Sequence, residues 1–428
     1  MERPVNRRGF LKGTVAGVAS LAGASLLGPL AETLAAGQAD DKDRPNVLMI
    51  AVDDLRPQLG CYGHEQMISP HIDALAGRGV LFKRAYCQVP VCGASRASLL
   101  TGLRPTNRRF VTYKTWARKD APDAVSLPGW FRRQGYETIS RGKIFHHKTD
   151  CKDAWSTLDR LRGFPGYVMA ESRQIGRAYR KKHGNSHKQG PATECADRPA
   201  SDYPDGKVAE RCMTDLKRLA KADKPFFLAA GFHKPHLPFA APKKYWDLYD
   251  RSKIDLADNP FAPKGAPRQA LHNWGELRGY YTGIPANGPL SDVQARELIH
   301  GYYACVSFID AQIGQLLAEL KRQGLANNTL VVLWGDHGWN LGEHGLWCKH
   351  CNFETSLHSP LIFAGPGVAE GKSTDALVEY VDLYPTLCDL AGLRQPDHLE
   401  GLSMAPLAHK PDRPWKQAVF SRYHKGGL

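Results

Sequence analysis

The chain has 428 residues, of which 42% are hydrophobic and 23% are charged, and its formal net charge is +14. This length supports one large α/β domain with a small appendage, which excludes a small domain that depends on disulfides for its stability; the ten cysteines are also too irregularly spaced for a disulfide framework. The basic balance favours an anionic partner, and nucleic acid, anionic lipid and sulfated polysaccharide are the three classes to weigh.

The first 36 residues predict an export signal. The stretch Asn6-Arg7-Arg8-Gly9-Phe10-Leu11-Lys12 precedes an Ala-, Gly- and Leu-rich run and a small-residue region that ends at Ala35 and Ala36. Gly and Ser interrupt the apolar run, which favours removal near Ala35 or Ala36 over a membrane anchor, and no other stretch is apolar enough to span a bilayer. We therefore expect export by the twin-arginine translocation machinery, to the periplasm or outside the cell, which argues against nucleic acid as the partner.

Four continuous apolar runs predict strands that are buried on both faces. They cover residues 46–52, 136–140, 225–230 and 329–334. Helical patterns, such as residues 297–322, separate them. The predicted fold is therefore α/β, with a large, mostly parallel sheet that is flanked by helices.

Each of these runs leads into ionisable residues. The polar clusters are Asp53-Asp54, residues 141–146, residues 233–236 and Asp336-His337. Taken singly, each cluster is better explained as a turn, a helix cap or a surface group. Ligands of open α/β sheets bind beyond the carboxyl ends of the strands, so four clusters at equivalent strand ends predict one site at that edge.

Cys92 opens a predicted helix in the stretch Val91-Cys92-Gly93-Ala94-Ser95-Arg96. Backbone N–H groups at a helix start and the guanidinium of Arg96 would stabilise an anion on or near residue 92. The alternative is a buried cysteine, because free cysteine is among the most buried residue types.

Two stretches predict long surface segments. Residues 151–204 are basic and weakly periodic, and we expect a surface excursion near the site. Residues 251–290 are rich in Pro, Gly and Asn, and we expect a loop that shapes a substrate pocket.

Further on, Cys348 and Cys351 form a C-x-x-C. By its spacing this motif is a redox pair or half of a zinc site, although the sequence contains no second C-x-x-C.

Asp53, Asp54 and Asp336 offer three hard carboxylates, which suit calcium or magnesium. His337 fits such a cation less well, because histidine prefers softer metals.

Residues 92–102 resemble the sulfatase signature, in which Cys-x-Ala-x-Arg runs into Ser-x-x-Thr-Gly. Further motifs look like the iduronate-2-sulfatase-like branch of that family, and the similarity runs from Asn46 to about Leu393. These motifs are residues 53–57, 60–63, 142–146, 231–239, 336–345, 347–354, 383–387 and 390–393.

The resemblance implies an alkaline-phosphatase/sulfatase-like fold and a formylglycine, which a maturation enzyme makes from Cys92 and whose hydrated aldehyde is the nucleophile. It implies a calcium ion whose ligands are Asp53, Asp54, Asp336, His337 and the modified Cys92. Around the sulfate it places Arg96, Lys143, His146, His233 and Lys349. The two histidines would act as acid and base, and the C-x-x-C would only flank a catalytic lysine.

The resemblance also divides the chain. After the export signal at residues 1–36, it implies a catalytic domain at 44–410 and, at 411–428, the start of a C-terminal subdomain that we expect to be largely absent from this chain. Ala94 stands where the most familiar form of the signature has proline, which leaves open which maturation system acts.

The resulting expectation is a calcium-dependent sulfuric ester hydrolase that removes 2-O-sulfate from uronate residues of a sulfated glycan. Three alternatives stay open. They are a sulfatase for another sugar or a small sulfate ester, a phosphomonoester or phosphodiester hydrolase of the same superfamily, and a non-catalytic protein that binds polyanions.

Overall fold

The computed structural model describes residues 44–423, except 162–165 and 184–189. The predicted export signal therefore lies outside the described residues. Among those that are described, no helix combines the length and the apolar character that crossing a membrane requires.

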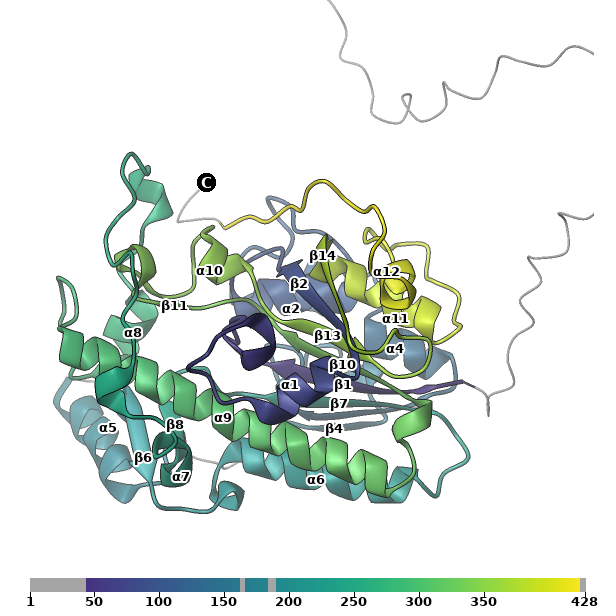
Figure 1. Ribbon diagram of the computed structural model, residues 1–428, viewed down its shortest axis with the longest axis horizontal. Coiled ribbons are helices and arrows are strands. Elements are labelled where there is room, and N and C mark those ends of the chain that lie inside the picture. The colour runs from purple at the N-terminus through teal and green to yellow at the C-terminus, as the bar shows by residue number, and fades with distance from the viewer. Residues whose placement is uncertain (1–43, 162–165, 184–189, 424–428) are drawn as a thin grey trace, which may run out of the picture. The chain divides into compact units, whose positions relative to one another are not determined.

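A sheet of eight strands forms the centre of the fold (Figure 1). Its order is β14-β2-β13-β10-β1-β7-β3-β4. The strands are β1 (Asn46–Val52), β2 (Gly79–Tyr86), β3 (Glu137–Gly142), β4 (Thr157–Asp159), β7 (Phe226–Phe232), β10 (Thr329–Gly335), β13 (Leu361–Ala364) and β14 (Lys372–Glu379). Only β13 runs antiparallel to its neighbours in this sheet, which confirms the prediction of a mostly parallel sheet.

The four predicted strands are β1, β3, β7 and β10, and they lie side by side in the middle of the sheet. Every residue of β1, β7 and β10 is buried. A strand with two apolar faces is stable only where helices cover both sides of its sheet. The continuous apolar runs therefore placed these strands correctly, within two residues at either end.

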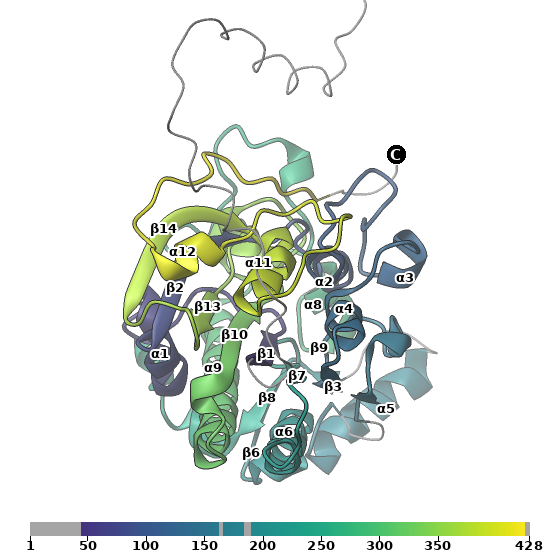
Figure 2. The same ribbon diagram turned by 90° about the vertical axis from the view of Figure 1, so that its right-hand side faces the viewer.

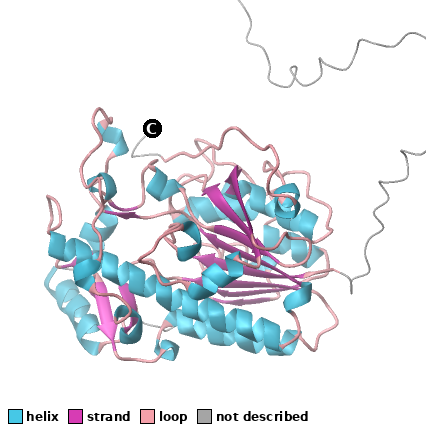
Figure 3. Cartoon of the chain, in the orientation of Figure 1, coloured by secondary structure: helices cyan, strands magenta, loops and turns pink. Residues whose placement is uncertain are grey.

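Helices cover both faces of the sheet (Figures 2 and 3). Alternate residues of β1 point to opposite faces, so Leu48 joins one hydrophobic core and Met49 the other. The first core includes α1 (Pro70–Ala76), α6 (Pro204–Leu219) and α9 (Asp292–Arg322), and the second includes α2 (Cys92–Thr101), α4 (Leu127–Arg133) and α11 (Leu383–Leu390). The helix predicted at 297–322 is α9, which begins five residues earlier.

Shorter elements complete the described part of the fold. The helices are α3 (Ala117–Asp120), α5 (Ala170–His183), α7 (Lys243–Trp246), α8 (Gly275–Tyr280), α10 (Glu354–Leu357) and α12 (Ala405–His409). Three two-stranded sheets pair β5 (Gly190–Pro191) with β9 (Tyr281–Thr282), β6 (Thr193–Ala196) with β8 (Phe239–Pro242), and β11 (Asn340–Leu341) with β12 (Trp347–Cys348).

The prediction for residues 151–204 was only partly right. This stretch contributes β4, which is an edge strand of the central sheet, as well as α5, β5 and β6. A strand of three residues is too short to show periodicity, and α5 is so rich in charged residues that it has a weak apolar stripe.

Residues 411–423 contain no helix or strand and lie against the domain. Lys416 Nζ pairs with Glu379 at 2.9 Å and with Asp382 at 2.5 Å, and the backbone N–H of Arg422 donates to the carbonyl of Gln88. The domain boundary at residue 410 and the subdomain beyond it remain predictions.

Candidate active site

Ionisable side chains meet at the carboxyl ends of the four central strands, as the sequence predicted. Asp53 and Asp54 follow β1, and Asp336 follows β10, which pairs with β1 in parallel. On the other side of β1, His233 follows β7, and Lys143 follows β3 next to it. Residues up to 283 positions apart in the chain thus share one edge because their strands are parallel neighbours.

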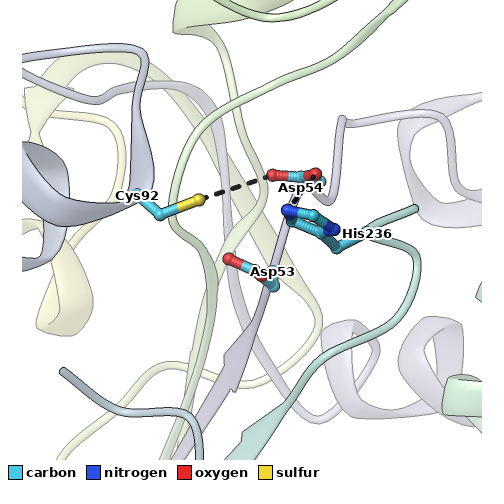
Figure 4. A group of neighbouring side chains, drawn as sticks. All are labelled: Asp53, Asp54, Cys92 and His236. Carbon is cyan, nitrogen blue, oxygen red and sulfur yellow. Dashed lines mark hydrogen bonds and ion pairs between the residues drawn. The ribbon is translucent and has the colours of Figure 1, made fainter. Parts of the chain in front are cut away.

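Cys92 faces this edge from the first residue of α2. Cys92 is 3% exposed, and its Sγ lies 3.2 Å from His337 Nε2. Sγ also lies 3.8 Å from Asp54 Oδ1, a contact that Figure 4 marks with a dashed line. Burial raises the pKa of the Cys92 thiol well above its usual value, and the nearby Asp53 carboxylate adds to this shift. The unmodified thiol is therefore a poor nucleophile at neutral pH.

Arg96 is fully buried beneath the carboxylates. Nε donates to Asp336 at 2.7 Å, and Nη2 donates to Asp53 at 3.1 Å. Nη1 donates to the backbone carbonyls of Lys143 and Ile144. The guanidinium thus joins α2 to the ends of β1, β10 and β3, and its donors are directed at protein atoms.

Two lysines flank the aspartates. Lys143 Nζ pairs with Asp53, and Lys349 Nζ lies 3.1 Å from Asp54 Oδ2. Burial alone would raise the pKa of Asp53, but Lys143 and Arg96 outweigh it and hold the pKa well below the usual range. Asp53 is therefore ionised. At Asp54, burial dominates and the pKa is raised.

The residues around Cys92 include two candidate sets of metal ligands. The donor atoms of Asp54, Cys92, Asp336 and His337 lie within 4.8 Å of one another, and so do those of Asp53, Asp54, Cys92 and His236. The first set fits a cation well. Nδ1 of His337 lies 2.9 Å from the carbonyl oxygen of Gly338 and must carry the proton, which leaves the Nε2 lone pair facing the centre.

The second set fits less well because of His236. Its two ring nitrogens face oxygen acceptors: Nδ1 lies 2.7 Å from the carbonyl of Leu237, and Nε2 lies 3.1 Å from Glu276 Oε1. This arrangement favours hydrogen bonds over metal ligation by His236. Of the predicted ligands, Asp54, Cys92, Asp336 and His337 share the first set, whereas Asp53 belongs to the second. Oxygen donors suit calcium.

A cavity of about 480 Å³ opens beside Cys92. Its wall includes two predicted site residues, His146 and Lys349, together with Tyr113, Tyr280 and Tyr281. The sequence predicted a loop at 251–290 that shapes a pocket. This stretch does line the cavity, but with α8 and the start of β9, to which Tyr280 and Tyr281 belong. The site thus has room for an organic group next to residue 92.

Both predicted acid–base histidines are held neutral in the protein. Burial, with the nearby Lys143, lowers the pKa of His146 to about 3, and the same two causes lower the pKa of His233. His146 lines the cavity, and its Nδ1 is buried without a hydrogen-bond partner. His233 Nδ1 instead lies 3.8 Å from Asp53.

The sequence reasoning missed Glu276, an acidic residue of α8 that also lines the cavity. Its Oε1 lies 2.8 Å from Lys349 Nζ and 3.1 Å from His236 Nε2. Burial would raise the pKa of Glu276, but Lys349 and His236 outweigh it and hold the pKa well below its usual value. No motif marks this residue; the neighbouring His-x-x-His at 233–236 was visible, but only its first histidine was assigned.

The C-x-x-C is a flank of Lys349, as the resemblance implied. All ten cysteines are free, and Cys348 and Cys351 are buried on either side of the lysine. Burial raises the pKa of Cys348 well above its usual value, which disfavours thiolate chemistry there.

Comparison with known proteins finds relatives of this chain. Residues 45–393 match the protein family described as Sulfatase. The human protein named Iduronate 2-sulfatase is 37% identical over 83% of this chain and 70% of its own length. A Formosa agariphila protein named Sulfatase is 34% identical over 86% of this chain and 73% of its own length.

Solved structures share the fold. A phosphonate monoester hydrolase from Silicibacter pomeroyi superposes with a TM-score of 0.68 at 27% identity, covering 88% of this chain and 79% of that one. An enzyme in complex with its substrate D-glucosamine-2-N,6-O-disulfate gives a TM-score of 0.70 at 21% identity, covering 89% of this chain and 84% of that one.

Proposed function

Because the chain belongs to the sulfatase family, we propose that it is a calcium-dependent sulfatase that uses formylglycine at position 92 and removes 2-O-sulfate from uronate residues of a sulfated glycan. The observation that carries the proposal is the position of Cys92. It stands at the start of α2, between buried carboxylates and a cavity large enough for a sugar ring. A formylglycine-generating enzyme is the partner that this proposal requires.

Formylglycine and calcium would each supply one kind of chemistry. A formylglycine at residue 92 would supply a hydroxyl nucleophile on its hydrated aldehyde, where the thiol has little nucleophilic character. Calcium would be held by Asp53, Asp54, Asp336 and His337, and would polarise a sulfate oxygen.

Side chains of the site can stabilise the developing charge and transfer the proton. Negative charge spreads over the sulfuryl oxygens as the ester bond breaks, and the ammonium groups of Lys143 and Lys349 lie where they would stabilise it. A bound sulfate ester raises the proton affinity of the neutral His146, because it brings negative charge next to the ring. Since His146 lines the cavity, it is the better placed histidine to protonate the departing alcohol, and His233 is left to act on the sulfate side.

The proposed substrate is argued from the names of similar proteins. The two proteins named Iduronate 2-sulfatase, from human and mouse, are 37% and 35% identical to this chain. Proteins named Arylsulfatase, from Clostridium perfringens, and Choline-sulfatase, from Rhizobium meliloti, are 29% and 28% identical. Greater similarity to the first group supports the uronate 2-O-sulfate over an aryl or choline ester.

We also propose export of the matured enzyme by the twin-arginine machinery, directed by residues 1–36. N-terminal sequencing of the protein from the periplasm or medium tests this proposal, because removal near Ala35 or Ala36 is expected.

The decisive test is the Cys92→Ala variant, with Cys87→Ala as its matched control. Both cysteines are buried and lie in the same tryptic peptide, 85–96. We expect mass spectrometry of wild-type protein, produced with a maturation enzyme, to find formylglycine at position 92 only. Sulfate release from a 2-O-sulfated uronate disaccharide should vanish in Cys92→Ala and persist in Cys87→Ala. Turnover by a folded Cys92→Ala protein would refute the mechanism.

A further inference from the structure

A chain of ring contacts leads from the cavity wall to the surface beside it. Tyr113 and His146 line the cavity, and their ring centroids lie 6.4 Å apart. His146 is followed by His147, whose ring centroid is 5.0 Å from that of His146 and which does not line the cavity. The surface that carries His147 is thus continuous with the pocket.

His147 packs flat on Trp116. The two rings are stacked with centroids 4.2 Å apart and planes 8° apart. His147 Nε2 also donates to the backbone carbonyl of Lys114 at 3.2 Å. These contacts hold the segment around Trp116 against the residues that follow β3, so this part of the surface has a defined shape.

Three lysines lie next to the stacked rings of Trp116 and His147. Lys114, Lys119 and Lys148 are exposed, and none of them is in an ion pair with another described residue. Lys119 Nζ lies 4.8 Å from the ring centroid of Trp116, and Lys114 Nζ lies 5.9 Å from that of Tyr113. Cation–π contacts of this kind restrict where an ammonium group can point.

Two acidic side chains of this segment are already engaged by other groups of the protein. Asp150 is buried, and its carboxylate accepts hydrogen bonds from the backbone N–H groups of Ala117 and Arg118. Asp153 pairs with Arg118. The lysine charges are therefore left for a partner from solution.

We propose that Lys114, Trp116, Lys119, His147 and Lys148, which we call the lysine rim, form a subsite for a second anionic sugar of the glycan whose sulfated residue occupies the cavity. Ammonium groups bind sulfate or carboxylate as point charges, and the stacked rings of Trp116 and His147 fix the surface from which the lysines project. The proposal rests on the proposed function, since the cavity must hold the neighbouring sulfated sugar. The lysine rim would thus make the enzyme prefer an oligosaccharide to a single sulfated sugar.

The test compares two substrates in the triple variant Lys114→Ala/Lys119→Ala/Lys148→Ala. Its matched control is Lys217→Ala/Lys221→Ala/Lys224→Ala, which removes three exposed lysines at the amino end of β7, the opposite edge of the sheet. For the rim variant we expect the KM of a 2-O-sulfated hexasaccharide to rise by roughly five- to tenfold, with a weaker dependence on salt. The KM of the matching disaccharide and both kcat values should stay within about twofold of wild type.

The control should match wild type on both substrates. An unchanged KM for the hexasaccharide, or an equal rise for both substrates, would overturn the proposal. Binding of the hexasaccharide to the Cys92→Ala protein, measured by calorimetry with and without the rim substitutions, separates the two proposals. If no sulfated sugar is turned over but the rim substitutions still weaken hexasaccharide binding, the result supports the subsite and refutes the proposed sulfatase activity. Equal competition by polyglutamate would show general polyanion binding and contradict the sugar subsite.

Discussion

Single charges in the site are placed so that each carboxylate has a cation beside it. Lys143 and Arg96 pair with Asp53, and Lys349 pairs with both Asp54 and Glu276. Buried ions are tolerated only when they are paired in this way. Removing one partner should therefore lower the stability of the fold as well as disturb the neighbouring charges.

Glu276→Gln tests this arrangement at the residue scale. Glutamine keeps the shape of the side chain but removes the charge that, together with Asp54, raises the pKa of Lys349 against the effect of burial. We expect kcat/KM to fall by roughly 10- to 100-fold, as is typical when a group that orients a functional residue is changed. We also expect a loss of thermal stability, because Lys349 and His236 lose an anionic partner.

The control for this variant is Glu319→Gln. Glu319 is also buried, but it lies near the end of α9 and pairs with Arg322. It precedes the amino end of β10, the opposite end of that strand from Asp336. The Glu319→Gln substitution should lower the free energy of unfolding and leave kcat/KM unchanged. If the two variants had the same kinetics, Glu276 would have no positioning role.

At the scale of helices and strands, the contact between β3 and β7 determines the position of Lys143. Gly142 has a φ of +75°, and Gly231 pairs with it across the two strands. A Cβ on Gly231 would lie 2.3 Å from the carbonyl oxygen of Lys143, which is also an acceptor for Arg96. The strand ends can approach closely only because both positions lack a side chain.

Gly231→Ala tests this contact at the element scale. The added methyl group must push the backbone of Lys143 away, so we expect a loss of about 1–3 kcal/mol in the free energy of unfolding and a large loss of sulfate release. Gly77→Ala is the matched control, because its Cβ would have only ordinary contacts at 3.6 Å. Wild-type activity in a folded Gly231→Ala protein would show that the site tolerates a shift of β3.

At the scale of the whole molecule, one cation site would join separate parts of the fold. Asp53 and Asp54 follow β1, Asp336 and His337 follow β10, and Cys92 begins α2. A ligand that binds only the folded chain stabilises it by mass action.

We therefore expect a chelator such as EDTA to abolish sulfate release and to lower the Tm of the matured enzyme by a few degrees. Added calcium should reverse both effects. Asp54→Asn should show a much smaller shift in Tm on chelation, since it lacks one of the carboxylates. A chelator-treated enzyme with full activity would remove the metal from the mechanism.

Much of this protein could be predicted from the sequence alone. The apolar runs determined the four central strands, and the residues after them determined that Asp53, Lys143, His233 and Asp336 would meet, because parallel strands direct their carboxyl ends to one edge. The start of α2 at Cys92 was visible as well. These features depend on local pattern and on the rules of strand packing.

The tertiary structure decided the rest. Glu276 reaches Lys349 across 73 positions of sequence from a helix that no pattern predicted, and Arg96 proved to be enclosed by the carboxylates and carbonyls that it joins. The stacking of His147 on Trp116 likewise depends on how a loop after α2 meets the end of β3. Contacts between distant segments set these positions, and a linear sequence carries no local signal for a contact that exists only after the chain has folded.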